Sequence, residues 1–507
     1  MSTKTNILPE ETAAQRWSRF SPIVTGEDYV ESLRNRGLEV YLFGELVEEP
    51  TDHPIIRPSI NSLKKTYELA IEEPELATAH SELIDAPVNR FLHIVASPDD
   101  LVKKNRMQRR MGQLTGTCFQ RCAGLDNISV LHSITYDIDQ KHGTSYHQRY
   151  LDFLKLAQRN NIVLAAGMTD PKGDRSKRPS EQVDPDMFMH ITKRTDKGVY
   201  VTGAKAHITG GINSHWMCVM PTMNLTEHDK DYAVIGLVPI DAAGMTFIYG
   251  RQSCDMRAME EGDIDQGNAQ YGGQETLVVF DNVFIPNEHV LMDGEYEFAQ
   301  DLVSRFTAYH RASYVCKTGL GDVMTGAAAQ VAEYNGAEKA SHIKDKLIEI
   351  THLNETIYSS AIASSHEAKQ LPSGIFINDE MLANVCKHNV TRFPYEISRL
   401  TQDLAGGLMV TLPSEADFNH EKVGPMLKKY LKGKHEVPVE FRQRILRLIE
   451  NMTLGRNAVG YLTESMHGAG SPQAQRIQIA RQMDVENKKS YARDLAGIIP
   501  VKVEFDK

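Results

Sequence analysis

Four side chains that can bind a metal or move a proton lie within eight residues, 310–317. They are an imidazole, a phenol, a thiol and an ammonium group: His310, Tyr314, Cys316 and Lys317. The flanks, 298–306 and 318–334, repeat apolar residues with helical periodicity, which predicts one buried helix through the whole stretch. Reactive groups are costly to bury without a partner. The alternative is a core thiol and a histidine bonded to the backbone, because free cysteine is among the most buried residue types.

Two further cysteines, Cys118 and Cys122, are four residues apart. Near the end of a helix predicted to begin at Ser97, this spacing would place both thiols on one helix face. Such thiolates can each bind a different iron of one cluster. No ferredoxin-like run of cysteines is present, so a four-iron cluster needs two more ligands, and Cys316 and His310 are available. Two buried thiols at a helix contact are the alternative.

Two loops could let a flat, phosphorylated cofactor approach the backbone. Residues 168–175 follow a predicted strand and carry charges of both signs, and residues 203–214 close a predicted hairpin with small side chains. The Gly-x-Gly-x-x-Gly and Walker patterns are absent, which argues against Rossmann and P-loop folds.

Two carboxylates, Glu275 and Glu464, have small neighbours that leave space around them, although a lone glutamate is more often on a solvated surface. Gly406 and Gly407, in a helical context, indicate close approach of another helix or of a phosphate, and helix packing is the more common cause.

Three regions with different periodicity must position these groups. We predict an α+β chain with an N-terminal helical domain (1–155), a central β domain (156–294) and a C-terminal helical domain (295–507). In the central region, short apolar segments separated by turns predict a compact β-barrel or sandwich. The helix that opens at Ser97, where Pro98 and two acidic residues follow, is predicted to run to about Cys122.

Composition excludes several classes of protein. The formal net charge of -11, without a long basic run, argues against nucleic-acid binding. No apolar run approaches the ~20 residues that span a bilayer, and we expect no signal peptide. Six cysteines in 507 residues are too few for a disulfide scaffold, which favours a reducing cytoplasm.

Several long segments resemble known flavoenzymes. Residues 280–286 resemble the segment that closes the β domain of acyl-CoA dehydrogenases, and residues 168–175 resemble the flavin loop of the 4-hydroxyphenylacetate 3-monooxygenase branch. A nearer resemblance, almost end to end, is to the 4-hydroxybutyryl-CoA dehydratase family, whose members also isomerise vinylacetyl-CoA. It is carried by residues 52–59, 118–122, 169–175, 249–255, 351–355, 405–410 and 463–476.

This resemblance implies an acyl-CoA dehydrogenase-like fold with a central β-barrel domain and a C-terminal helical bundle. It also implies a homotetramer that binds FAD, a [4Fe-4S] cluster and an acyl-CoA substrate. By motif match, the cluster ligands would be Cys118, Cys122, His310 and Cys316. The catalytic residues would be His310, Glu464, Tyr314, Lys317, Glu275 and Thr209. The flavin would contact Met168, Thr169, Asp170, Lys172, Asp174, Arg175, Lys205, His207, Thr209 and Asn213, with Gly406 and Gly407 at the diphosphate of the same or a neighbouring subunit.

One spacing departs from the family pattern. The family separates the ligand histidine from the last cysteine by six residues, whereas five separate His310 from Cys316 here. In a regular helix, seven steps return to the same face and six do not. We therefore expect either a distorted helix or a different ligand geometry at this point.

The implied reaction is dehydration of 4-hydroxybutyryl-CoA to crotonyl-CoA, which makes the chain a hydro-lyase with isomerase activity. The proton lost from C3 is not activated by the thioester, and acid–base catalysis alone contributes about 10²–10⁴-fold. The resemblance implies a flavin-mediated radical mechanism in which the cluster acts as a Lewis acid. His310 or Glu464 would take protons, and Tyr314 or Lys317 would assist hydroxide departure. The alternatives are a flavin-dependent aromatic monooxygenase with buried cysteines and, more distantly, a non-catalytic flavoprotein.

Overall fold

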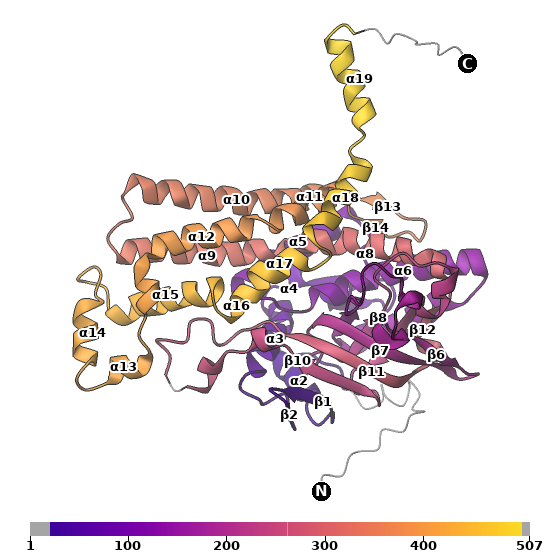
Figure 1. The fold of residues 1–507 in the computed structure, drawn as a ribbon, viewed down its shortest axis with the longest axis horizontal. Helices are drawn as coiled ribbons and strands as arrows, with labels where there is room; N and C mark the ends of the chain where they lie inside the picture. The colour runs from indigo at the N-terminus through magenta and orange to yellow at the C-terminus, as the bar shows by residue number, and fades with distance from the viewer. Residues whose placement is uncertain (1–20, 261, 499–507) are drawn as a thin grey trace.

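The computed structural model describes residues 21–260 and 262–498, and its chain order is helical, then mainly β, then helical (Figure 1). The predicted α+β class is confirmed. The N-terminal helices are α2 (Gly26–Ser32), α3 (Arg57–Glu72), α4 (Pro74–Ala77), α5 (Pro98–Thr115), α6 (Cys122–His142) and α7 (Tyr146–Asn160). No helix in the described ranges is long and apolar enough to cross a membrane.

The β region consists of two sheets that face each other. The six-stranded sheet has the order β2-β1-β10-β11-β7-β6, and the four-stranded sheet has the order β12-β9-β8-β5. Val201 and Phe247 of the larger sheet share one hydrophobic cluster with Met217 of the smaller sheet. Of the two predicted arrangements, the described strands therefore form a sandwich. The strands are β1 (Glu39–Leu42), β2 (Glu45–Leu46), β5 (Leu164–Gly167), β6 (His190–Arg194), β7 (Gly198–Thr209), β8 (Trp216–Val219), β9 (Val234–Pro239), β10 (Met245–Tyr249), β11 (Glu275–Pro286) and β12 (Val290–Asp293).

The N-terminal region is less uniformly helical than the sequence predicts. Its strand β1 pairs in parallel with β10 and so extends the central sheet. A separate hairpin forms between β3 (Thr78–Ser81) and β4 (Ala86–Asn89). These strands are four residues long or shorter, which is too short for a sequence pattern to distinguish them from a loop.

The C-terminal region is a helical bundle around α9 and α10, and α19 projects away from it (Figure 1). The helices are α8 (Ala299–Ser313), α9 (Cys316–Tyr334), α10 (Ser341–His366), α11 (Glu380–Val390), α12 (Phe393–Ala405), α13 (Glu415–Asn419), α14 (Gly424–Tyr430), α15 (Val439–Thr453), α16 (Arg456–Ala458), α17 (Glu464–His467), α18 (Pro472–Gln482) and α19 (Val485–Leu495). A short hairpin joins β13 (Lys369–Gln370) to β14 (Phe376–Ile377).

The helix predicted from Ser97 to Cys122 is two helices. Its start is confirmed, because the Ser97 side chain accepts a hydrogen bond from the Asp100 amide (3.1 Å). It ends at Thr115, since Gly116 adopts a left-handed conformation with φ 60°, a common helix terminator. Cys118 therefore lies in a connecting loop and Cys122 begins α6, so the prediction that both thiols share one helix face is wrong.

The single helix predicted over residues 310–317 is also interrupted. Helix α8 ends at Ser313 and α9 begins at Cys316. Backbone hydrogen bonds here join residues three apart, as from Lys317 to Tyr314 (3.0 Å) and from Thr318 to Val315 (2.9 Å). A helix tightened to three residues per turn returns to the same face after six steps. This local tightening is the kind of distortion that the five-residue spacing predicts.

Candidate active site

Three cysteines from different elements share one buried pocket. Burial, followed by the charge of Glu464, raises the pKa of Cys118 well above its ordinary value, and the charges of Cys122 and Cys316 add to the effect. Burial also raises the pKa of Cys316 to about 11. Because these groups influence one another electrostatically, the loop after α5, the start of α6 and the start of α9 converge at this pocket.

The close approach of α5 and α9 positions Cys316. A Cβ atom at Gly112 of α5 would lie 2.4 Å from the carbonyl oxygen of Cys316. A Cβ atom at Gly319 of α9 would lie 2.1 Å from the carbonyl oxygen of Arg109. The two helices can therefore pack at this distance only where both positions are glycine.

His310 is oriented by a buried carboxylate. Its Nδ1 atom lies 2.7 Å from Oδ2 of Asp126, which is one turn after Cys122 on α6. The other carboxylate oxygen accepts hydrogen bonds from Lys104 Nζ (2.5 Å) and Ser313 Oγ (3.0 Å). Burial opposes ionisation of Asp126, but the Lys104 charge and the His310 hydrogen bond outweigh it and lower its pKa. An ionised Asp126 places the proton of a neutral His310 on Nδ1 and leaves Nε2 able to accept a bond.

The candidate acid and base groups adjoin the thiols. Oε1 of Glu464 lies 3.2 Å from Nζ of Lys317, and the Tyr314 hydroxyl is 3.5 Å from the Glu464 carbonyl oxygen. A π-helical turn (Val459–Thr463) precedes Glu464, and such turns are frequent at functional sites. A Cβ atom at Gly460 within this turn would lie 3.2 Å from Oε2 of Glu464 and 3.6 Å from Cβ of Cys118. The carboxylate therefore lies beside the cysteine pocket.

Glu275 is a second carboxyl group at the same place. It faces Thr209 across the β7–β11 pair, and the Thr209 hydroxyl donates to its Oε1 atom (2.6 Å). Burial, followed by the charge of Glu464, raises the pKa of Glu275 well above its usual range. The protonated form of Glu275 is therefore favoured more than in an ordinary glutamate, whereas Glu464 lies against the ammonium group of Lys317 (3.2 Å). Two carboxyl groups in such different environments can serve as an acid and a base.

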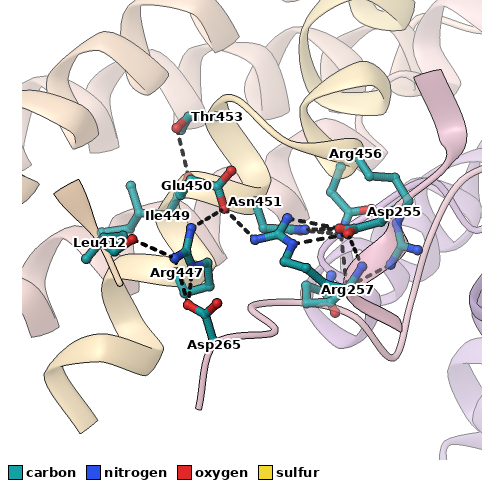
Figure 2. A network of polar contacts seen from close by, with 12 residues as sticks. Asp255, Arg257, Asp265, Leu412, Arg447, Ile449, Glu450, Asn451, Thr453 and Arg456 are labelled. Carbon is teal, nitrogen blue, oxygen red and sulfur yellow. Dashed lines mark hydrogen bonds and ion pairs between the residues drawn. The ribbon is translucent and has the colours of Figure 1, made fainter. Parts of the chain in front are cut away.

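An ionic network fixes the loop that leads into β11. Arg257 contacts Asp255 within the loop (2.9 Å) and Glu450 of α15 (2.7 Å), and Arg447 of α15 contacts Asp265 (2.6 Å) (Figure 2). Partly buried charge pairs with several partners hold a fixed geometry better than isolated surface pairs. The loop between β10 and β11 is thereby tied to the C-terminal bundle.

The predicted flavin residues divide into internal and exposed sets. Lys205 donates to Asp170 (2.6 Å) and to the carbonyl oxygens of Met168 (3.0 Å) and Met220 (2.8 Å), so its charge is used inside the protein. The Thr169 carbonyl accepts from the Ala206 amide (2.8 Å). These bonds attach the loop to β7. The residues left at the surface of the loop are Lys172, Asp174 and Arg175.

The loop 168–175, β7 and α17 approach one another around His207. Partial desolvation, followed by the charges of Lys172 and His467, lowers the pKa of His207. Asn213 is instead fully buried, and its Nδ2 atom donates to Ser59 Oγ (2.8 Å) and Gln120 Oε1 (2.9 Å). Its amide therefore braces the turn after β7.

Gly406 and Gly407 are not gathered with these residues. Gly406 ends α12 in a left-handed conformation (φ 80°), and both glycines are exposed. Within the described part of the chain, apart from the adjoining residues, no atom lies within 4 Å of a Cβ atom placed at either position. They form an open backbone surface on this chain.

Sequence reasoning missed the groups that orient the reactive residues. Asp126 could have been suspected because it follows Cys122 by one helical turn, and Gln120 because it lies between the two cysteines. Lys104 and Lys387 carry no local pattern that marks them. All four side chains are buried, and only the fold brings them to the site.

Comparisons with known proteins show the family of the chain. The 4-hydroxyphenylacetate 3-hydroxylase N-terminal and C-terminal family profiles match residues 25–292 and 299–497. The chain is 55% identical to the 4-hydroxybutyryl-CoA dehydratase/vinylacetyl-CoA-Delta-isomerase of Clostridium aminobutyricum, over 94% of this chain and 100% of that protein. It is 25% identical to a 4-hydroxyphenylacetate 3-monooxygenase oxygenase component from a Geobacillus species, over 85% and 88% of the two chains.

Solved structures share the fold. The oxygen-tolerant archaeal 4-hydroxybutyryl-CoA dehydratase from N. maritimus superimposes with a TM-score of 0.93 at 66% identity, covering 96% of this chain and 97% of that chain. The FAD complex of the 4-hydroxyphenylacetate 3-monooxygenase oxygenase component superimposes with a TM-score of 0.81 at 22% identity, covering 93% and 98%. The similarity to the monooxygenase component, at 22% identity, shows a shared fold alone.

Proposed function

Because the chain belongs to the 4-hydroxybutyryl-CoA dehydratase family, within the wider 4-hydroxyphenylacetate 3-hydroxylase family, we propose that it dehydrates 4-hydroxybutyryl-CoA to crotonyl-CoA and isomerises vinylacetyl-CoA. The observation that carries the proposal is the pocket in which two buried thiols, Cys118 and Cys316, and the partly buried thiol of Cys122 adjoin the Lys317–Glu464 pair. Aromatic hydroxylation is the alternative activity within this fold. The much higher identity to the dehydratase than to the monooxygenase, 55% against 25%, favours dehydration.

The donor set of the pocket fits an iron–sulfur cluster. Three thiols and one imidazole nitrogen are suitable iron ligands, and we propose Cys118, Cys122, Cys316 and Nε2 of His310. Among the described residues, no group of three or more His, Cys, Asp or Glu side chains is spaced for a single metal ion. A cluster requires wider spacing than a single ion, because each of its ligands binds a different iron. The buried ammonium group of Lys317 favours the negative charge of thiolates.

Flavin binding is supported by the fold family, one member of which is solved with FAD. We propose that the flavin lies against the loop 168–175 and the end of β7. Lys205 and Asp170 would hold the loop in place through their buried ion pair. The exposed backbone at Gly406 and Gly407 would meet a diphosphate from another subunit.

The chain's own residues can then be given roles. When bound, the flavin would supply one-electron oxidation and reduction, and the cluster would supply a Lewis acid for the departing hydroxyl. Glu464, a carboxylate beside Lys317, is suited to accept the proton from the carbon next to the thioester. Burial, followed by the charge of Glu464, raises the pKa of Glu275 and so favours the protonated form, which can donate a hydrogen bond to the substrate. Its partner Thr209 fixes the orientation of this carboxyl group.

Tyr314 and Lys317 can assist the departure of hydroxide. Burial, followed by the charge of Glu464, raises the pKa of Tyr314 well above its ordinary value, so its hydroxyl remains a proton donor at neutral pH. Lys317 is fully buried and keeps its charge, because Glu464 and the thiols raise its pKa despite burial. A proton donor and a cation in a dry pocket stabilise a leaving oxyanion far more than they would in water.

Oligomerisation and location remain predictions. We propose a homotetramer in the cytoplasm. No residue of α19 is buried within this chain, and an isolated helix of this length is marginally stable in water. Packing of α19 against another subunit would remove this instability.

The first experiment is the content of iron and acid-labile sulfide per flavin in protein purified without oxygen. We expect about four of each per flavin, together with release of crotonyl-CoA from 4-hydroxybutyryl-CoA. Flavin without iron or sulfide, and oxygen-dependent hydroxylation of a phenol, would contradict the proposal and establish the monooxygenase alternative.

A further inference from the structure

A second buried lysine, Lys387 of α11, lies beside Tyr314 and beside the residue that follows Glu464. Its side chain is fully enclosed. Its Nζ atom lies 2.5 Å from the carbonyl oxygen of Ser465 and 4.4 Å from the centre of the Tyr314 ring. A lysine is almost never this deeply buried unless specific partners hold it there.

The two partners of Lys387 adjoin the reacting groups. Ser465 directly follows Glu464, and its own hydroxyl lies within hydrogen-bond distance of the Gly460 carbonyl oxygen (3.3 Å) in the π-helical turn. The phenol ring beneath the ammonium group carries the hydroxyl that lies 3.5 Å from the Glu464 carbonyl. One cation therefore contacts both the peptide after the candidate base and the ring of the candidate proton donor.

Among the residues that the structure describes, no carboxylate forms an ion pair with Lys387. Burial, followed by the positive charges of Lys317 and Arg311, lowers its pKa to about 7, while the charges of Glu464 and Cys386 oppose the change. Lys317 lies on α9, Arg311 on α8 and Glu464 on α17. A cation placed against two others contributes little to stability, and such an arrangement is common where a group serves function.

We propose that Lys387 is a positioning residue that fixes the peptide following Glu464 and the ring of Tyr314 relative to each other. The hydrogen bond to the Ser465 carbonyl oxygen holds the peptide, and the cation–π contact holds the ring. The lysine does not touch the reacting atoms in this arrangement. This inference rests on the proposed function, since Glu464 and Tyr314 are placed at the reacting centre there.

The test compares Lys387→Met, Lys387→Arg and the unchanged enzyme. Methionine is unbranched like lysine but ends one atom earlier, and it removes the donor and the charge, whereas arginine keeps both. We expect Lys387→Met to lower kcat by about 10²-fold, the effect of a small misplacement of reacting groups, with KM changed less than about threefold. The kcat of Lys387→Arg should be at least about tenfold higher than that of Lys387→Met.

A second measurement does not depend on turnover. Hydrogen exchange of the amides in residues 459–468 should be faster in Lys387→Met, because the Ser465 carbonyl loses its partner. The arginine variant should return the exchange rate toward that of the unchanged enzyme. Flavin, iron and sulfide content should be equal in all three proteins.

Lys346→Met is the matched control. Lys346 pairs with Asp403 (2.6 Å) between α10 and α12, and its side chain is partly exposed. A partly exposed pair contributes at most about 1 kcal/mol, so kcat and exchange in residues 459–468 should not change.

Two results would overturn the proposal: an unchanged kcat in Lys387→Met, or a loss of kcat that arginine does not reduce and that accompanies loss of cofactors. If the unchanged enzyme fails to dehydrate 4-hydroxybutyryl-CoA, the proposed function fails instead. The exchange measurement would then still decide whether Lys387 fixes the turn.

Discussion

At the scale of single residues, Asp126 organises one half of the site. It is fully buried and accepts hydrogen bonds from Lys104, His310 and Ser313. A carboxylate bonded to one nitrogen of a histidine fixes the ring and makes the other nitrogen a better ligand. Removal of such a partner commonly weakens metal binding by about 10–100-fold.

We expect Asp126→Asn to reduce the iron retained per flavin. The amide keeps the shape of the carboxylate but cannot stabilise the proton on Nδ1 of His310 to the same degree. The measurement is iron and sulfide per flavin after exposure to a chelator. The variant should lose its iron at a chelator concentration about 10–100-fold lower than the unchanged enzyme requires.

This variant leaves the Lys104 charge buried without its partner, which costs about 3–5 kcal/mol. The double variant Lys104→Met with Asp126→Asn removes both charges and should recover stability without recovering iron retention. Ser313→Ala, which removes one neutral hydrogen bond to Asp126, should retain iron. Full retention in the double variant would show that Asp126 does not orient a ligand.

At the scale of elements, the crossing of α5 and α9 carries Cys316 to the pocket. The helices touch through Gly112 and Gly319, where a Cβ atom would meet backbone atoms at 2.4 Å and 2.1 Å. Backbone atoms cannot move aside as the end of a flexible side chain can. The crossing therefore has little tolerance for added volume.

We expect Gly319→Ala to destabilise the protein by about 1–3 kcal/mol, the usual cost of overpacking a core. The measurement is the urea midpoint of unfolding. Gly326→Ala is the matched control on the same helix, because no atom of another described element lies within 4 Å of its Cβ position. Alanine there should be neutral or stabilise the helix by up to about 1 kcal/mol. Equal midpoints for the two variants would contradict the tight crossing.

At the scale of the whole molecule, stability depends on histidines buried without charge. His132 of α6 and His147 of α7 stack edge to face, with ring centres 4.7 Å apart. Burial, followed by the charge of His147, lowers the pKa of His132 to about 4. Its Nδ1 atom has no hydrogen-bond partner among the described residues. Protonation of His132 therefore disfavours the packing of α6 on α7.

The buried His132 makes the folded protein less stable as the pH falls, because folding lowers the pKa of this histidine. The folded pKa, about 4, lies below the ordinary value of 6.5, so the unfolded chain takes up this proton first as the pH falls. The stabilisation is fully present above pH 6.5 and is lost as the pH falls from there toward 4. A shift of this size corresponds to at most about 3 kcal/mol.

We expect the melting temperature to fall less between pH 7 and pH 5 in His132→Phe than in the unchanged enzyme. Phenylalanine keeps an aromatic ring against His147 and Tyr150 and cannot be protonated. His342→Gln, at an exposed histidine of α10, should retain the full pH dependence. A His132→Phe variant with an unchanged pH profile would exclude His132 as the source.

Much of the local structure can be predicted from the sequence. The capping serine at Ser97 starts α5 as expected, and apolar periodicity reveals the strands of the central region and the order of the three regions. These features depend on hydrogen bonds and side-chain patterns within a few consecutive residues. The residue types that could bind iron or move protons are equally visible, and the family profiles and relatives support the resemblance read from those segments.

The tertiary structure alone decided how these residues meet. Cys118 and Cys122 belong to a loop and the next helix rather than to one helix face, because Gly116 ends α5. Thr209 faces Glu275 only through the register of β7 and β11, and Asp126 reaches His310 across 184 residues of sequence. Contacts between residues so far apart depend on the packing of whole elements, which no local pattern specifies. The sequence determined which chemistry the chain can perform, and packing determined where that chemistry is assembled.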